Sequence, residues 1–249
     1  LPGRTQRITR VIEALAPSGN PKIVDFAKLF WANRGNHNDM TAQKFLPEFT
    51  FEELQAEARS ALNKGLLAGM PYGTPAIRSE ADLNRELNDL RASLFDPEFE
   101  PMITAKSPRG NMDILQASAN NFYSNLRLAD LKGFQERHPL NSRLVRGKDG
   151  RLTEEVYRAG TADGKIPPGR YAMFLKKANE FLGKAQAYAE PGQDKVLADL
   201  IRYYETGDFR DWIQFGTDWV RNNPAVDFAN GFIEVYRDAR GAKGTSQSF

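Results

Sequence analysis

The 249-residue sequence predicts an α+β fold that is predominantly helical and has a small antiparallel or mixed β component. Three observations lead to this prediction. Apolar residues recur at helical spacing through most of the chain. Two alternating segments flank a hairpin-type turn near 140–157, and a segment near 226–236 is rich in strand-favouring residues. We therefore expect about eight helices and three or more strands.

The first 94 residues are expected to form helices. Apolar side chains recur every three or four positions from residue 6 onward. Asn20 is a favourable N-cap followed by a proline, which a first helical turn tolerates, so one helix is expected to begin there. Thr50 and Glu53 have the spacing of a capping box, which marks the start of another. A further helix is expected over 79–94, where leucines at near-heptad spacing are typical of core packing: Leu83, Leu87, Leu90 and Leu94.

The proline-containing segment 95–110 is the least regular part of the chain. A segment of this kind is either a linker or a loop that packs over the surface. We expect residues 1–249 to form a single lobe with a possible internal boundary here. That boundary would separate a helical part, 1–94, from a part with helices and strands, 111–249.

In the second part, short helices are expected over 112–121 and 128–137, followed by the hairpin around Gly147-Lys-Asp-Gly150. The clearest helix covers 170–189, because its apolar residues all lie on one side. Two more are expected over 194–206 and 209–221. The closing strand follows near 226–236, and residues 244–249 are expected to contain no further element, as if the chain were a fragment of a longer protein.

Composition excludes several classes of function. The net charge of +2 gives no reason to expect nucleic acid as a partner. No apolar run approaches the length that spans a bilayer, so no membrane partner is expected. The absence of cysteine excludes disulfides and thiolate chemistry. We expect a cytoplasmic protein, and a periplasmic location is also compatible with this composition.

Metal ligands are scarce in this sequence. Its two histidines, His37 and His138, are far apart, and neither lies in a His-Glu-x-x-His motif. No metal site is therefore expected in this chain. Nucleophile and phosphate-loop motifs are also absent.

The closing segment sets polar groups into an otherwise apolar strand pattern. Glu234 and Tyr236 are two residues apart, so on a strand their side chains lie on one face. A carboxylate that accepts a cation beside a phenol that donates a hydrogen bond is a plausible half of a binding cleft. An amphipathic edge strand with a hydrated face produces the same alternation. Spacing alone leaves both interpretations open.

Several segments resemble the dipeptidyl-peptidase III family, a family of zinc-dependent exopeptidases. The main one is Asn230-Gly-Phe-Ile-Glu-Val-Tyr-Arg-Asp-Ala-Arg-Gly. The other matching segments occur in the family's order, and they extend the resemblance over most of the chain: Phe30-Trp-Ala-Asn-Arg-Gly, Lys44-Phe-Leu-Pro-Glu-Phe, Leu140-Asn-Ser-Arg-Leu-Val, Lys184-Ala-Gln-Ala-Tyr, Leu200-Ile-Arg-Tyr-Tyr-Glu-Thr-Gly-Asp and Trp219-Val.

The resemblance implies an enzyme that removes dipeptides from the amino terminus of oligopeptides. It implies that Glu234 holds the free amino terminus of the substrate and that Tyr236 is catalytic, stabilising the tetrahedral intermediate through its hydroxyl. Asn141 and Asn230 are implied to lie near the bound peptide.

The sequence departs from the family in one respect, because the zinc-binding histidine-glutamate motif is absent. We therefore expect an amino-terminal, substrate-binding lobe of a larger peptidase, inactive and without zinc when isolated. A missing carboxy-terminal half would supply zinc and the general base. The alternatives are a non-catalytic helical peptide-binding or scaffold module, and a helical interaction domain with no cleft.

Overall fold

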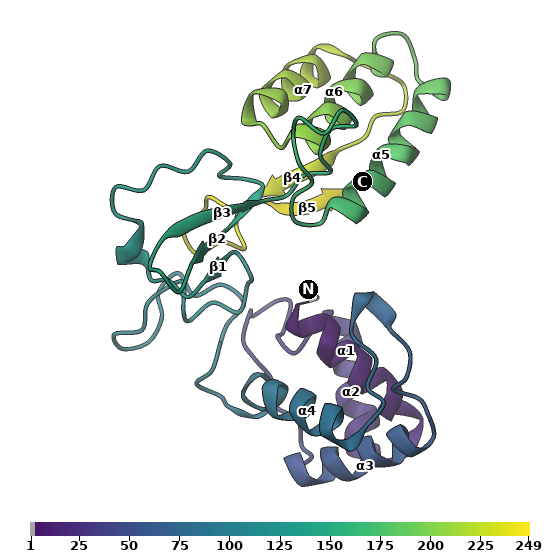
Figure 1. Ribbon diagram of the computed structural model, residues 1–249, viewed down its shortest axis with the longest axis vertical. Helices are drawn as coiled ribbons and strands as arrows, with labels where there is room; N and C mark the ends of the chain where they lie inside the picture. Colours follow the sequence, from purple (N-terminus) through teal and green to yellow (C-terminus); the bar gives the residue numbers. More distant parts are fainter. Residues whose placement is uncertain (1–2) are drawn as a thin grey trace. The chain divides into compact units, whose positions relative to one another are not determined.

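The computed structural model describes residues 3–249, except for the side chain of Tyr72. The chain forms two compact units (Figure 1, in which the colours follow the sequence). The first unit extends to Met112 and includes 116–119, and the second comprises 113–115 and 120–249. Secondary structure is predominantly helical with two small sheets, so the predicted α+β class is confirmed.

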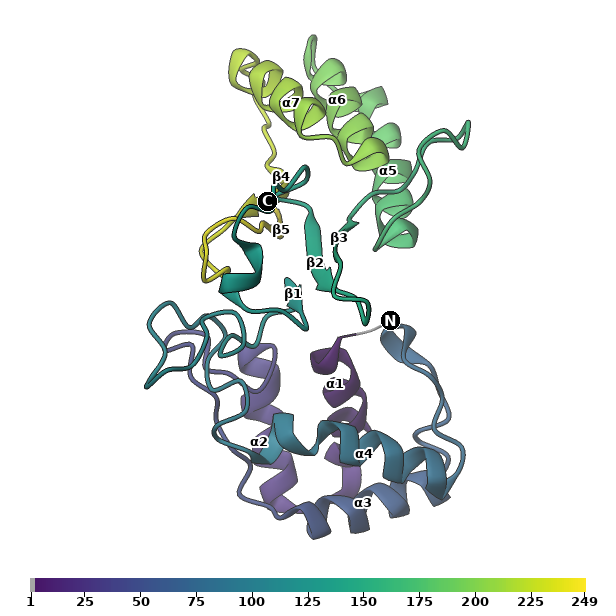
Figure 2. The ribbon, with the colours of Figure 1, turned by 60° about the vertical axis from the view of Figure 1, so that its left-hand side comes forward.

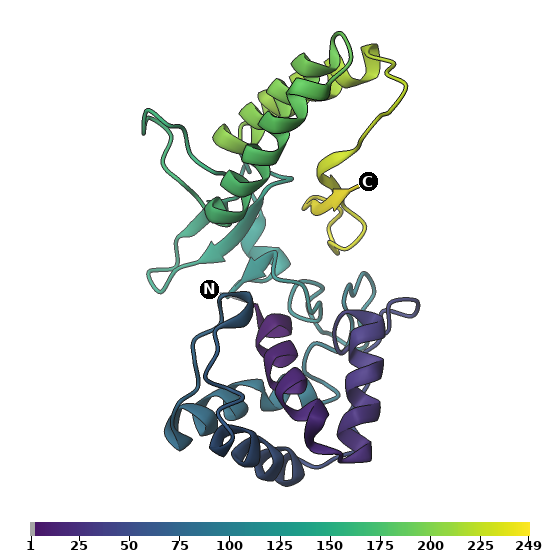
Figure 3. The ribbon, with the colours of Figure 1, turned by 90° about the vertical axis from the view of Figure 1, so that its right-hand side faces the viewer.

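Four α-helices build the first unit: α1 (Arg4–Leu15), α2 (Pro21–Asn33), α3 (Phe51–Asn63) and α4 (Glu80–Phe95). Helices α1 and α2 run alongside each other (Figure 3), and α3 and α4 pack together across α1 (Figure 2). Their apolar faces form one core, which includes the four leucines of α4. Short 3₁₀ turns follow α1 and precede α4: η1 (Ala16–Ser18) and η2 (Pro71–Gly73).

The predicted caps of these helices are confirmed. The Asn20 side chain accepts a hydrogen bond from the Lys22 amide at 3.1 Å, which satisfies one of the free N–H groups at the start of α2. At the start of α3, the Thr50 hydroxyl accepts from the Glu53 amide at 3.1 Å, while the Glu53 carboxylate accepts from the Thr50 amide at 2.7 Å. This reciprocal pair is a capping box.

His37 is buried beside the segment that follows α4, and its Nε2 lies 2.9 Å from the carbonyl oxygen of Glu100. Burial lowers the pKa of His37 below its ordinary value of 6.5. On acidification the unfolded chain therefore takes up a proton at this position before the folded chain does, and stability is lost as the pH falls below about 6.5.

We expect the free energy of unfolding to fall more between about pH 7.5 and 5.5 in the wild type than in His37→Gln, since only the wild type carries this titration. Urea unfolding of both proteins at the two pH values measures the difference. Equal pH dependence in the two proteins would contradict this account.

The segment after α4 differs from the prediction. Residues 112–121 form turns instead of a helix, and only Leu128–Leu131 of the predicted 128–137 segment is helical, as a 3₁₀ turn (η3). Backbone amides inside both segments are bonded to distant partners: the Ala119 amide donates to the Met102 carbonyl oxygen at 2.8 Å, and the Arg137 amide donates to the Glu154 carboxylate at 3.0 Å. These bonds take the place of the helical bonds that the two amides would otherwise make.

The first sheet of the second unit contains the predicted hairpin. Strands β2 (Ser142–Arg146) and β3 (Leu152–Val156) are antiparallel, and the short β1 (Tyr123–Ser124) pairs in parallel with β2. Three α-helices follow, α5 (Ala172–Ala185), α6 (Gln193–Thr206) and α7 (Phe209–Arg221), close to their predicted bounds. Helix α6 packs against both α5 and α7 (Figure 2).

The second sheet differs in detail from the prediction. The closing strand is shorter than 226–236, because β4 spans only Asn230–Glu234. It pairs in antiparallel fashion with β5 (Thr245–Ser248), which lies in the stretch where no element was expected. A polar sequence such as that of β5 carries no hydrophobic alternation, so only its backbone pairing with β4 identifies it as a strand.

An aromatic core joins the helices of this unit to the sheets. Phe232 of β4 packs against Tyr157 and Tyr204, with ring centroids 5.4 and 6.1 Å apart. Gly231, one residue earlier, faces the other way and lies against the Trp212 ring of α7. A Cβ atom at this position would come within 2.6 Å of that ring. The absence of a side chain at Gly231 therefore lets β4 approach α7 closely.

Gly231→Ala is expected to destabilise the protein by about 1–3 kcal/mol, because the indole must move from a packed position. Gly216→Ala in α7 is the matched control, since a Cβ atom there meets nothing within 4 Å. That variant is expected to gain about 0.5–1 kcal/mol from the higher helix propensity of alanine. Chemical denaturation measures both, and equal effects would contradict the packing argument.

None of the helices within residues 3–249 has the length and apolar character that crossing a bilayer requires.

Candidate functional site

The two main predicted site residues lie at the end of β4. Glu234 is its last residue, and Tyr236 lies in the turn that follows, where the Asp238 amide donates to the carbonyl oxygen of Val235 at 3.1 Å. Tyr236 is therefore not part of a strand, and simple alternation along β4 does not determine where its side chain points.

The register of the second sheet nevertheless places both groups on one face. Glu234 lies opposite Thr245, across a bulge at Ile233, and residues directly opposite in an antiparallel pair share a face. Gln247 shares that face because it is two residues from Thr245 in β5. The Gln247 side-chain amide donates to the Tyr236 hydroxyl at 3.3 Å, which brings the phenol over the same face as Glu234.

Both groups are available to a ligand. Tyr236 is 53% exposed, and Glu234 is half-buried. Across the described residues, the Glu234 carboxylate makes no hydrogen bond or ion pair, so its oxygens remain free acceptors. The Tyr236 hydroxyl accepts from Gln247, and its own proton remains free to be donated. A carboxylate that accepts from a cation and a phenol that donates to an oxygen thus lie on one face.

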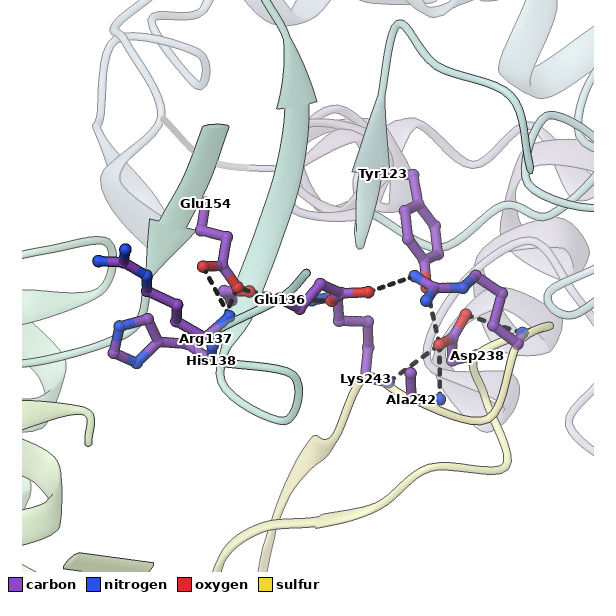
Figure 4. Close-up of polar contacts among 10 residues, drawn as sticks. Tyr123, Glu136, Arg137, His138, Glu154, Asp238, Ala242 and Lys243 are labelled. Carbon is purple, nitrogen blue, oxygen red and sulfur yellow. Dashed lines mark hydrogen bonds and ion pairs between the residues drawn. The ribbon is translucent and has the colours of Figure 1, made fainter. Parts of the chain in front are cut away.

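The loop 235–244 that carries Tyr236 is held by Asp238 (Figure 4). The Asp238 side chain is fully buried and accepts hydrogen bonds from the Tyr123 hydroxyl at 2.8 Å and from the amides of Ala242 and Lys243, both at 2.9 Å. It also accepts from the Arg240 amide at 3.1 Å. Burial raises the pKa of the Tyr123 phenol, which therefore stays protonated and donates to this carboxylate.

An ion-pair group adjoins this carboxylate. Glu136 pairs with Arg240 at 2.7 Å and with the fully buried Lys243, whose ammonium also donates to the Ser142 hydroxyl at 2.9 Å. Burial lowers the pKa of Lys243 even though Glu136 favours its charged form. Nearby, Glu154 accepts from the backbone amides of Arg137 and His138, both at 3.0 Å. Ion pairs therefore join the loop to the chain segment that precedes β2.

Sequence reasoning did not identify this buried network. Its members are far apart in the chain, and each resembles an ordinary surface residue in its local sequence. The only local signal is a charged run directly after an apolar strand.

The two predicted asparagines make structural hydrogen bonds. Asn141 is 1% exposed and donates to the carbonyl oxygens of Tyr157 at 3.3 Å and Gly207 at 3.0 Å, which ties the hairpin to the end of α6. Asn230 accepts from the Tyr204 hydroxyl and donates to the Ser248 hydroxyl at 3.2 Å. Both amides thus hold the elements around β4 in place.

The part of the chain that the structure describes brings together no group of three histidine, cysteine, aspartate or glutamate side chains that could hold a metal ion. His138 hydrogen-bonds through Nδ1 to the carbonyl oxygen of Gly207 at 2.7 Å. The side chains within 3–249 therefore do not assemble a ligand set that fits zinc.

A cavity of about 540 Å³ lies in the second unit along α6 and α7. Its lining includes Asp199, Arg202, Asp208, Arg210 and Asp211, and none of the four predicted site residues belongs to it. Its charges are largely paired with one another, as in Arg202–Asp211 at 2.9 Å and Arg210–Asp208 at 2.7 Å.

Comparisons with known proteins converge on one group of enzymes. The model of peptidase family M49 matches residues 104–249. Dipeptidyl peptidase 3 of Mus musculus is 25% identical over 252 residues, which covers 90% of this chain and 32% of the mouse protein. The Homo sapiens enzyme is 34% identical over 113 residues, which covers 42% of this chain and 15% of that protein.

A solved structure, dipeptidyl-peptidase III from Corallococcus sp. strain EGB, aligns with 99% of this chain and 38% of its own at a TM-score of 0.44 and 14% identity. The chain spans about a third or less of the length of these curated relatives.

Proposed function

The chain belongs to peptidase family M49, and on this basis we propose that it is the substrate-binding portion of a zinc-dependent, dipeptidyl-peptidase III-like enzyme. The whole enzyme would remove dipeptides from the amino terminus of oligopeptides. The observation that carries the proposal is the Glu234 carboxylate, which has no partner among the described residues and lies on the same face as the Tyr236 hydroxyl.

Glu234 is proposed to bind the amino-terminal ammonium of the peptide. A half-buried carboxylate without a partner in the described part of the chain is attracted to a cation, and a charge-assisted hydrogen bond to the ammonium contributes more than a neutral one. Recognition of a free amino terminus makes an exopeptidase, because an internal peptide bond offers no such charge.

Tyr236 is proposed to donate its hydroxyl proton as a hydrogen bond to the oxygen of the carbonyl under attack. That oxygen gains negative charge as the tetrahedral intermediate forms, so a donor aimed at it stabilises the transition state more than the ground state. The hydrogen bond from Gln247 supports this role, since it orients the phenol and leaves its proton available. Asn141 and Asn230 are proposed to contribute by holding β4 and the hairpin in place.

Zinc ligands are proposed to come from other parts of a longer polypeptide. The described side chains assemble no metal-binding group, while the matched relatives are about three times as long as this chain. When bound, zinc would supply a Lewis acid and an activated water. We expect the isolated chain to bind oligopeptides without hydrolysing them.

Peptide binding by the isolated chain tests the proposal. Tetra-alanine with a free amino terminus is expected to bind to the wild type, and its acetylated form is expected to bind at least about tenfold more weakly. Calorimetry measures both affinities, and a chromogenic dipeptidyl substrate with added zinc measures hydrolysis. Binding that is indifferent to acetylation would favour a non-catalytic peptide-binding or scaffold module instead.

A further inference from the structure

A second charged cluster lies on the hairpin of the second unit, apart from the network in Figure 4. Arg143 of β2 and Glu155 of β3 are directly opposite each other, with 3.9 Å between Nη1 and Oε2. Arg170, which follows the loop after β3, donates to the same Glu155 oxygen at 3.0 Å. Two guanidinium groups therefore share one carboxylate oxygen, and the described residues provide one negative charge for two positive charges here.

One buried donor of each of these arginines is not hydrogen-bonded within the described residues. The Nε atoms of Arg143 and Arg170 are both buried and have no partner in the described chain. The separation of Arg143 from Glu155 exceeds hydrogen-bond range, so the carboxylate provides it with attraction but no bond. A guanidinium has five N–H donors, and buried donors without a partner cost free energy.

The surroundings support the Arg170 guanidinium and leave both arginines accessible. The Arg170 guanidinium stacks over the Tyr171 ring at 5.0 Å, and the Tyr171 ring packs against Tyr157 at 4.9 Å. The Asn121 side chain donates to the Tyr171 hydroxyl at 3.1 Å. The side chains of Arg143 and Arg170 retain 23% and 19% of their exposure, so a ligand from solvent can reach them.

The backbone at Tyr171 is strained. Its φ of 62° lies in the left-handed region, which costs a residue with a side chain about 1–2 kcal/mol. Strain that persists in a well-packed structure often marks a functional position. Here it sets the ring against which Arg170 is stacked.

We propose that Arg143 and Arg170 form a binding site for a carboxylate group of the peptide, with Glu155 occupying part of the site until the ligand arrives. Two convergent guanidinium groups match the two oxygens of a carboxylate, which accepts parallel N–H bonds. The identity of the ligand as a peptide rests on the proposed function. Its carboxylate is either the carboxy terminus or an acidic side chain, since the chemistry of the two is the same.

Paired peptides and charge-matched variants test the site. Tetra-alanine with a free carboxy terminus is compared with its amide, and an amidated tetrapeptide with one glutamate is compared with its glutamine counterpart. Arg143→Gln and Arg170→Gln are each expected to weaken binding of the carboxylate-bearing peptides about tenfold and to leave the others nearly unchanged. Arg151→Gln removes the same charge from an exposed position of the same hairpin. It is expected to leave the binding of both kinds of peptide unchanged.

Glu155→Gln separates a binding role from a structural one. If the arginines only stabilise the hairpin, loss of the Glu155 carboxylate lowers the stability of the protein and does not raise its affinity for carboxylate-bearing peptides. If they bind a carboxylate, this variant removes an internal competitor, and carboxylate-bearing peptides are expected to bind more tightly than to the wild type. A preference for the free carboxy terminus or for the glutamate peptide identifies the source of the carboxylate, and equal affinity for all four peptides would overturn the proposal.

This test is independent of the role of Glu234. The peptides that test Arg143 and Arg170 differ in their carboxylates and share the same amino terminus, whereas the peptides that test Glu234 differ only at the amino terminus. If none of the peptides binds measurably, titration with acetate tests the carboxylate site directly. A saturable shift of the Arg143 and Arg170 side-chain NMR signals with acetate, absent with chloride at equal ionic strength, supports the site. No saturable shift would overturn it.

Discussion

Replacing Asp238 with alanine is expected to lower the free energy of unfolding by about 3–5 kcal/mol, the range measured when one partner of a buried charged group is removed. The Asp238 carboxylate is fully buried and accepts from Tyr123 and from the backbone amides of Arg240, Ala242 and Lys243. Alanine leaves these donors without a partner in a place that water reaches poorly, so the variant loses more than the bonds themselves.

A graded series distinguishes this explanation from a general effect of substitution. Tyr123→Phe removes only one of the bonds and is expected to cost about 1 kcal/mol. Asp238→Asn keeps one carbonyl oxygen and should fall between the two. Denaturant unfolding measures all three variants, and a cost of about 1 kcal/mol or less for Asp238→Ala would show that the loop does not depend on this carboxylate.

Glu136→Ala is expected to have an effect of similar size, about 3–5 kcal/mol, because it leaves a buried ammonium uncompensated. Lys243 has no exposed side-chain surface, and Glu136 is its ion-pair partner as well as that of Arg240. Without Glu136, Lys243 keeps, among the described residues, its hydrogen bond to the uncharged Ser142 hydroxyl and the weaker attraction of the more distant Glu154.

The double variant Glu136→Ala, Lys243→Met provides the control. Apolar replacement of both members of a buried ion pair is often neutral or stabilising, so the double variant is expected to recover much of the loss. Thermal and denaturant unfolding of the two single variants and the double variant measure this coupling. Additive losses would show that the two side chains do not act as a pair.

Local signals explain which parts of the fold the sequence predicts correctly. The starts of α2 and α3 depend on Asn20, Thr50 and Glu53, whose hydrogen bonds stay within three residues. The hairpin of β2 and β3 depends on a four-residue turn with a glycine at each end. Capping and turn chemistry act within a few residues, so a single sequence contains them.

Features that depend on distant partners escape such reasoning. Strand β5 has a polar sequence and exists through its pairing with β4. The Ala119 amide, in a segment expected to be helical, donates instead to the carbonyl oxygen of Met102, earlier in the chain. Asn141 has the sequence context of a turn residue, yet it is buried because Gly207 and Tyr157 supply carbonyl oxygens from elsewhere in the chain.

The candidate site lies between these two cases. Alternation predicts that Glu234 and Tyr236 share a face, but β4 ends at Glu234. The bulge at Ile233 and the hydrogen bond from Gln247 bring the two groups to one face instead. Neither feature can be read from a sequence that does not reveal β5.

The most direct measurement is a thermodynamic cycle that combines Glu234→Gln with acetylation of the peptide's amino terminus. Glutamine keeps the shape of the side chain and removes its charge, and acetylation removes the charge of the ligand. If Glu234 binds the ammonium, each change alone weakens binding and the two together weaken it little further, with a coupling of about 1.5–3 kcal/mol, as for other hydrogen bonds to charged groups. If the two effects add to within about 0.5 kcal/mol, Glu234 does not bind the amino terminus.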